Sequence, residues 1–149
     1  RPARRWDAAG EMVSMPDPAP DASPPRRLLL LSADWQTRTL TLVSLQELGY
    51  AVLALPSLHL GVKAILAERV DPPLVLLDTK DDPRATPDQV RALRNLVPDA
   101  VMILIAEAWY RERYAPLAAQ MQAFLVRPIL MHDLVATVQR LLPPSATSE

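Results

Sequence analysis

The sequence predicts an α/β fold, in which a doubly wound, five-stranded parallel sheet carries helices on both faces. Five short apolar runs recur along the chain, and segments with apolar residues at helical spacing lie between them. The apolar runs are continuous rather than alternating, which is typical of strands that are buried on both faces. The connections are short, as in right-handed βαβ units, and we expect the flavodoxin-like strand order 2-1-3-4-5.

The composition excludes several classes of protein. The chain has 149 residues, of which half are hydrophobic, and its formal net charge is −1. This composition indicates a globular domain and not a strongly basic nucleic-acid-binding or membrane-surface domain. The chain has no cysteine, which excludes disulfides and thiolate chemistry and fits a cytoplasmic location. No apolar run is long enough to span a membrane, and no signal peptide is predicted.

Three segments are predicted along the chain. Residues 1–25 are rich in proline, which lacks a backbone donor, so we expect a disordered linker or tail there. Residues 26–142 are expected to form the folded domain, and residues 143–149 a C-terminal tail. Because the chain begins with Arg rather than Met, we expect it to be a piece of a longer protein.

The predicted strands are short apolar runs, and the third of them organises the rest. It consists of four apolar residues that end in the carboxylate of Asp78, and parallel sheets place functional groups at the carboxyl ends of their strands. Asp78 is therefore a candidate site residue, although a strand-ending aspartate also caps turns. The five predicted strands cover residues 27–31, 50–55, 74–78, 101–106 and 123–127.

Helix boundaries are predicted from capping residues. Gly49 is expected to end the first helix, Ser57 to cap the second, and Thr86 to cap the third with Pro87 in its first turn. Pro116 should keep the fourth helix short or kinked. The five predicted helices cover residues 36–48, 58–69, 87–97, 111–122 and 131–142.

From Arg26 to Leu142 the sequence resembles the receiver domains of two-component response regulators. The four-leucine run resembles their first strand, and Leu48-Gly49-Tyr50 resembles the end of their first helix. The segment ending at Asp78 resembles the strand that carries their phosphoacceptor aspartate, and Arg127-Pro128 falls where they have Lys-Pro. The resemblance implies a regulatory role in two-component signalling, with Asp78 in the phosphoacceptor position.

The site that the resemblance implies is incomplete. The family's acidic pair falls on Ser32 and Ala33, and its hydroxyl residue on the fourth strand falls on Ile105. Its lysine falls on Arg127 and its switch aromatic on Phe124. Ser32 is a weak neutral ligand for Mg²⁺, which prefers carboxylate oxygens, and Ala33 is no ligand. Ile105 cannot hydrogen-bond a phosphoryl group.

Two interpretations of Asp78 follow. In the first, the phosphorylation site is degenerate, Asp78 pairs with Arg127 across the sheet end, and no cofactor is bound. The domain is then a non-catalytic module that regulates an attached or separate output domain through protein–protein contacts. In the second, Asp78 still accepts phosphate, and Asp34, Asp81 or Asp82 supplies a displaced Mg²⁺ site.

A third interpretation is a small-ligand sensor that uses the open strand ends as a pocket, since Ser32, Ala33 and Ile105 suit a less polar ligand. No Gly-rich phosphate loop is present, which argues against a nucleotide enzyme of the P-loop or dinucleotide type. The only histidines, His59 and His132, lie on separate predicted helices, so no metal site is expected.

Three aromatic residues follow the fourth strand, and they are candidates for an interface. In receiver domains, the face built from helix 4, strand 5 and helix 5 is where dimers and effector domains dock. Trp109, Tyr110 and Tyr114 fall beside this face, and aromatic residues are enriched in such contacts. The alternative is that they only cover the sheet end. The basic residues are scattered among acids, so we expect no direct contact with nucleic acid.

Overall fold

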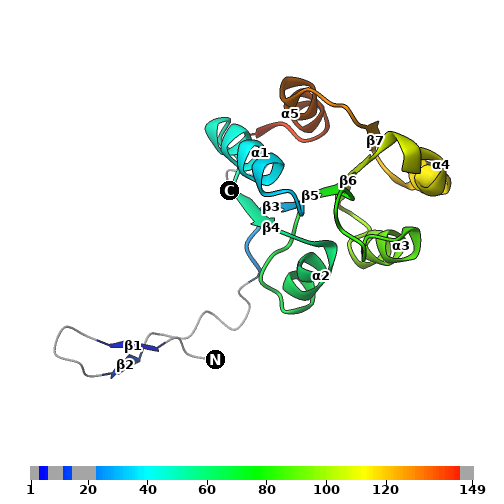
Figure 1. The fold of residues 1–149 in the computed structure, drawn as a ribbon. Helices are drawn as coiled ribbons and strands as arrows, with labels where there is room; N and C mark the ends of the chain where they lie inside the picture. The colour runs from blue at the N-terminus through cyan, green and yellow to red at the C-terminus, as the bar shows by residue number, and fades with distance from the viewer. Residues whose placement is uncertain (1–3, 7–11, 15–22, 145–149) are drawn as a thin grey trace.

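The computed structural model of the chain describes residues 4–6, 12–14 and 23–144. Five strands form one parallel sheet in the order β4-β3-β5-β6-β7, and Figure 1 shows it with helices on both faces. The flavodoxin-like order 2-1-3-4-5 that the sequence predicts is therefore confirmed. The strands are β3 (Leu28–Leu31), β4 (Val52–Leu55), β5 (Leu74–Asp78), β6 (Val101–Ala106) and β7 (Ala123–Val126).

The helices form two layers. On one face of the sheet lie α1 (Trp35–Glu47) and α5 (Met131–Leu141), and on the other lie α2 (Leu58–Leu66) and α3 (Pro87–Leu96) (Figure 1). The segment between β6 and β7 contains only the short helix α4 (Arg111–Tyr114), which lies between two 3₁₀ helices, Ala108–Tyr110 and Ala115–Gln120. Pro116 lies in the second of these, and it shortens the helix as predicted because it has no backbone donor.

The leucine run of β3 faces both layers. Leu29 and Leu31 pack in the core under α2 and α3, whereas Leu28 and Leu30 pack in the core under α1 and α5. Successive residues of a strand point to opposite faces of the sheet, and helices cover both faces, so all four side chains are buried. Strand β5 is divided in the same way, and this is why both strands are continuous apolar runs rather than alternating ones.

Capping follows the sequence signals closely. The Ser57 hydroxyl accepts a hydrogen bond from the Leu60 amide at 3.1 Å, and the Thr86 hydroxyl accepts one from the Gln89 amide at 3.3 Å. Gly49 has a φ of +95°, which glycine adopts without steric cost, and its amide donates to the carbonyl of Gln46. Together with the bond from the Tyr50 amide to the carbonyl of Leu45, this closes a Schellman motif at the end of α1.

The second helix, like the fourth, is shorter than predicted. The second helix is expected to reach Arg69, but α2 ends at Leu66, and Arg69 is exposed. The reason is local: Glu68 has a φ of +57°, outside the helical region, and its amide donates to the carbonyl of Ile65.

In the described ranges, no helix combines the length and the hydropathy that a membrane-spanning segment requires.

Six residues of the segment 1–25, which is predicted to be a disordered linker or tail, form two short strands. Strands β1 (Arg4–Trp6) and β2 (Met12–Ser14) pair antiparallel, with Arg5 opposite Val13. The proline argument does not apply to these six residues, because none of them is proline and each keeps its backbone donor. The rest of residues 1–22, and the tail from residue 145, lie outside the described residues.

Candidate functional site

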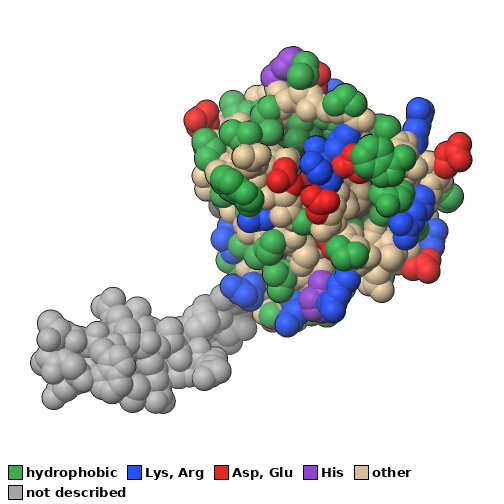
Figure 2. Space-filling view, viewed as in Figure 1, with side chains coloured by type: hydrophobic (Ala, Val, Ile, Leu, Met, Phe, Trp, Pro, Cys, Tyr) green, Lys and Arg blue, Asp and Glu red, His purple; other side chains and the backbone are tan. Residues whose placement is uncertain are grey.

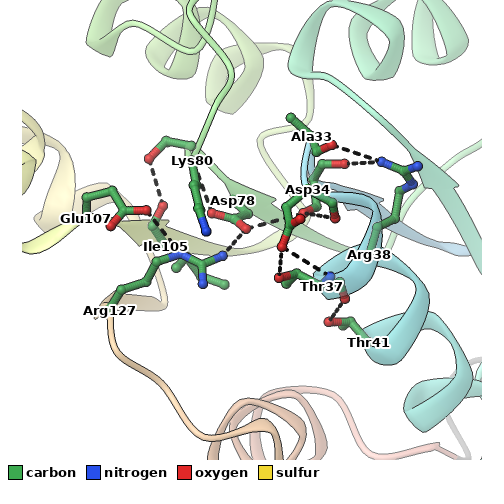
Figure 3. A network of polar contacts seen from close by, with 12 residues as sticks. Ala33, Asp34, Thr37, Arg38, Thr41, Asp78, Lys80, Ile105, Glu107 and Arg127 are labelled. Atoms are coloured by element: carbon green, nitrogen blue, oxygen red, sulfur yellow. Dashed lines mark hydrogen bonds and ion pairs between the residues drawn. The ribbon is translucent and has the colours of Figure 1, made fainter.

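The carboxyl ends of the parallel strands meet at one rim of the sheet, and several predicted site residues, among them Asp78, Ala33 and Arg127, lie there (Figure 3). Asp78 ends β5, directly opposite Ile105 of β6. Ser32 follows β3, and Arg127 follows β7. The alternation of helix and strand therefore brings together residues that are up to 95 positions apart in the chain.

The Asp78 carboxylate is engaged by three groups of its own chain. Its side chain is only 2% exposed, and it forms an ion pair with the Arg127 guanidinium, which donates to Oδ2. The Ser32 hydroxyl donates to the same oxygen at 3.3 Å, and the Lys80 amide donates to Oδ1 at 3.1 Å. The predicted pairing of Asp78 with Arg127 is confirmed, and both carboxylate oxygens have partners.

Glu107 is a site residue that the sequence analysis missed. It follows β6 at the same rim, and its Oε1 lies 3.6 Å from Nε of Arg127 (Figure 3). Both atoms are buried, and neither forms a hydrogen bond within the part of the chain that the structure describes. Arg127 therefore lies between two acidic side chains, and we call Asp78, Glu107, Arg127 and Ser32 the charged cluster. The position of Glu107 one residue after a predicted strand was the signal that could have identified it.

The end of β3 is occupied by a cation from α1. Arg38 donates from Nη1 to the carbonyl of Ser32 at 2.7 Å and to that of Ala33 at 3.4 Å. Asp34 is the N-cap residue of α1. Its carboxylate accepts hydrogen bonds from the Thr37 hydroxyl at 2.5 Å and from the Thr37 amide at 3.3 Å. The Thr37 hydroxyl is the main cause that lowers the pKa of Asp34, and the charge of Lys80 contributes.

The two other acids proposed for a displaced metal site lie elsewhere. Asp82 is buried, and its carboxylate accepts from the Leu58 amide at 2.8 Å and the Arg84 amide at 3.2 Å. It therefore satisfies an N-terminal donor of α2 from outside that helix. Asp81 is exposed, with a φ of +59°.

The donor set at the rim does not fit Mg²⁺. Among the described residues, no three histidine or acidic side chains lie close enough together to hold a metal ion. The carboxylate best placed to bind one, that of Asp78, already faces a guanidinium, and Ser32 and Ala33 add no charge. His59 and His132 lie on α2 and α5, as predicted, and His132 contacts Asp133.

The side chains of Ile105 and Phe124 pack in or against the hydrophobic cores. The Ile105 side chain is buried in the core under α1 and α5, and its carbonyl accepts from both the amide and the hydroxyl of Thr79 at 3.0 Å. Thr79 therefore places a hydroxyl beside the predicted position, but that hydroxyl already donates to the Ile105 carbonyl. Phe124 is partly buried and packs against the core under α2 and α3.

A hollow of about 550 Å³ lies beside the charged cluster, between the loop that follows β5 and the segment that follows β6.

Of the three predicted interface residues, Trp109 and Tyr110 are 75% and 45% exposed. Tyr114 differs from the prediction, because it is only 4% exposed and its hydroxyl donates to the carbonyl of Ala85. Tyr114 lines the hollow, but because it is buried it is not available to a partner protein. A contact of Trp109 or Tyr110 with a second copy stays a prediction.

The comparison with known proteins identifies the fold. No family model and no curated protein matches the chain. Among solved structures, an adenylate cyclase from Rhodopirellula baltica superposes with a TM-score of 0.68 at 17% identity, over 83% of this chain and 90% of that one. The response regulator TrrA from Thermotoga maritima, in complex with Mg²⁺ and BeF, gives 0.63 at 24% identity, over 78% and 99%.

A receiver domain protein from Methanospirillum hungatei gives a TM-score of 0.63 at 22% identity, over 80% of this chain and 94% of that one. At these identities the similarity establishes the fold, and the fold is that of response-regulator receiver domains. The resemblance inferred from the sequence is therefore confirmed at the level of the fold, and the charged cluster lies at the strand ends where a receiver-like site is expected.

Proposed function

We propose that this domain is a receiver-like regulatory module in which the phosphorylation site is degenerate. The module acts through protein–protein contacts on an output domain, either attached or separate, and is neither an enzyme nor a metal-binding protein. The receiver fold supports a role in two-component signalling. The observation that carries the proposal is the engagement of both Asp78 oxygens by Arg127, Ser32 and the Lys80 amide.

The chemistry of acyl phosphate formation supports this interpretation. Asp78 would have to attack phosphorus with a carboxylate oxygen while a divalent cation neutralises the phosphoryl oxygens. Oδ2 already accepts two donors, and the guanidinium supplies the positive charge that a metal would otherwise supply. Arg127 also lies between Asp78 and Glu107, so its guanidinium is already occupied by acids of the chain and is not free to bind a phosphoryl group.

The test is incubation of the purified chain with acetyl phosphate and Mg²⁺, followed by intact-mass analysis. We expect no mass increase of one phosphoryl group in the unaltered chain or in the matched control, Asp78→Ala. A variant that carries Ser32→Asp, Ala33→Asp, Ile105→Thr and Arg127→Lys supplies the missing groups and should gain the modification. A phosphoryl adduct on the unaltered chain that disappears in Asp78→Ala would overturn the proposal.

One observation favours the alternative, a working phosphoacceptor. Asp78 ends the middle strand of the sheet, which is the position that the receiver resemblance gives the phosphoacceptor. In that case the ion pair with Arg127 must open before phosphorylation. Repeating the incubation with Arg127→Lys alone separates the two functions, because lysine keeps the positive charge but not the guanidinium pair, so a working phosphoacceptor becomes faster. A degenerate site stays unmodified.

A further inference from the structure

We propose that the hollow beside the charged cluster binds a small ligand made of a planar aromatic ring with a carboxylate or phosphate group. The hollow opens at the carboxyl end of the sheet, between the loop that follows β5 and the segment that follows β6. Ligands of open α/β sheets bind at this end of the strands, and 550 Å³ is within the usual size of a small-molecule pocket. The inference stands whether or not Asp78 accepts phosphate.

One wall of the hollow is aromatic and uncovered. Trp109 is the most exposed large hydrophobic side chain of the described residues, and its ring centre lies 6.2 Å from that of Tyr110 with a tilt of 59°. Figure 2 shows exposed hydrophobic side chains among charges of both signs on one face of the domain. A planar ring that stacks on Trp109 would remove apolar surface from water and gain the geometry that aromatic pairs prefer.

The cation of the hollow is Arg113, which aromatic rings hold in place. Its guanidinium carbon lies 5.7 Å from the ring centre of Tyr110 and 5.9 Å from that of Tyr114. These contacts orient the guanidinium without using its N–H donors. In the described part of the chain, Arg113 forms no ion pair with a carboxylate. A carboxylate or phosphate group is the acceptor that fits its planar set of donors.

The acids around the hollow do not oppose an anion as strongly as their number suggests. Asp82 accepts from the Leu58 amide at the start of α2 and from the Arg84 amide of its own loop, and Glu107 lies against Arg127. The third acid that lines the hollow, Asp81, is an exposed loop residue, and it has no such partner among the described residues. Lys80, on the same loop, adds a second positive charge, although that charge also acts on Asp34. Arg113 and Lys80 are therefore the cations that a ligand anion would meet in the hollow, whereas Asp82 and Glu107 already have donors of the chain beside them.

The probes for the test are AMP and 4-hydroxybenzoate, which join a ring to a phosphate and to a carboxylate. Adenosine and phenol serve as rings without the anion, and inorganic phosphate and acetate as anions without the ring. Isothermal titration of the full chain should show saturable binding of at least one aromatic anion. The matching neutral ring and the free anion should bind at least about tenfold more weakly.

Matched variants then locate the site. Trp109→Ala should weaken binding by about tenfold or more, and Arg113→Gln should remove the preference for the anion over the neutral ring. Trp35→Ala and Arg91→Gln are the controls, because Trp35 is 65% exposed on α1, Arg91 lies on α3, and neither lines the hollow. Both controls should bind as the unaltered chain does.

Three results would overturn the inference. The first is the absence of saturable binding for both aromatic anions. The second is binding that Trp109→Ala and Arg113→Gln leave unchanged. The third is a dimer, seen by sedimentation, that Trp109→Ala dissociates while no probe binds, since the aromatic wall would then be a contact between copies of the chain.

Discussion

Two regions at the same rim of the sheet treat their polar groups in opposite ways. In the charged cluster, Asp78 is buried, Arg127 is 20% exposed, and their charges face each other. In the neighbouring hollow, Trp109 projects into solvent, and Arg113 contacts two aromatic rings and forms no ion pair with any acid that the structure describes. The fold brings functional side chains to both regions. A side chain is available to a ligand only where the chain has not already satisfied it.

The difference has an energetic origin. A buried carboxylate is costly unless a counter-charge and hydrogen bonds compensate for lost hydration, and the cluster supplies both. Arg113 beside the hollow is exposed to solvent, so its charge needs no partner. The predictions that follow test this contrast, in order of decreasing effect.

Removal of the cluster's cation should have the largest effect on stability. Arg127→Met leaves the Asp78 carboxylate buried without its counter-charge, and we expect the free energy of unfolding to fall by about 3 kcal/mol. Urea denaturation measures this change. Adding Asp78→Asn to Arg127→Met should restore much of the loss, because the uncompensated charge is then gone.

The matched control for this prediction is Arg91→Met. Arg91 pairs with Asp88 at 3.3 Å on the exposed side of α3, so its loss should cost less than about 0.5 kcal/mol. Equal losses for Arg127→Met and Arg91→Met would mean that the charged cluster is not the compensated, buried pair described above.

A smaller effect is expected at Asp82, which joins the loop beneath the hollow to α2. Asp82→Ala removes the acceptor of the Leu58 and Arg84 amides, and we expect a loss of about 1–2 kcal/mol. Asp99→Ala is the control, because Asp99 is exposed in a loop, and thermal or urea unfolding compares the two. A loss no larger than that of the control would show that Asp82 does not cap α2.

Loss of the Tyr114 hydroxyl should change the free energy of unfolding by a still smaller amount. Tyr114→Phe removes the hydroxyl that donates to the carbonyl of Ala85, and should cost about 1 kcal/mol, whereas Tyr110→Phe should cost almost nothing. Both variants keep the ring, so urea denaturation isolates the contribution of the hydroxyl.

Burial raises the pKa of Tyr114 and that of Tyr50 above the ordinary tyrosine value. Above about pH 10 the unfolded chain therefore loses these protons more readily than the folded chain, so stability should fall as the pH rises beyond that value. Below it, the contribution is fully present. The Tyr50→Phe, Tyr114→Phe double variant should show a flatter alkaline decline, and an unchanged slope would contradict the assignment.

Much of the fold could be predicted because its signals are local. Continuous apolar runs gave the strands, and Ser57, Thr86 and Gly49 marked helix ends through bonds to residues only three or four positions away. The pairing of Asp78 with Arg127 was also within reach, because parallel strand ends share a rim.

The parts of the site that sequence reasoning missed depend on contacts between distant residues. Asp82 was considered as a metal ligand, yet it caps a helix 24 positions earlier in the chain. The binding of Arg38 to the end of β3 and the burial of Tyr114 follow from how helices rest on the sheet, which periodicity does not specify. Glu107 was missed because the resemblance to receiver domains implies no role for its position.

The most direct test of the central claim observes the Lys80 amide, which donates to Asp78 Oδ1, in a chain labelled with ¹⁵N. Mg²⁺ and then beryllofluoride, a mimic of a phosphoryl group, are added while its NMR resonance is followed. If Asp78 is fully engaged by Arg127 and Ser32, the resonance should not move beyond the small uniform shifts caused by salt. A saturable shift of the Lys80 resonance at one equivalent of beryllofluoride, lost in Asp78→Ala, would contradict the account.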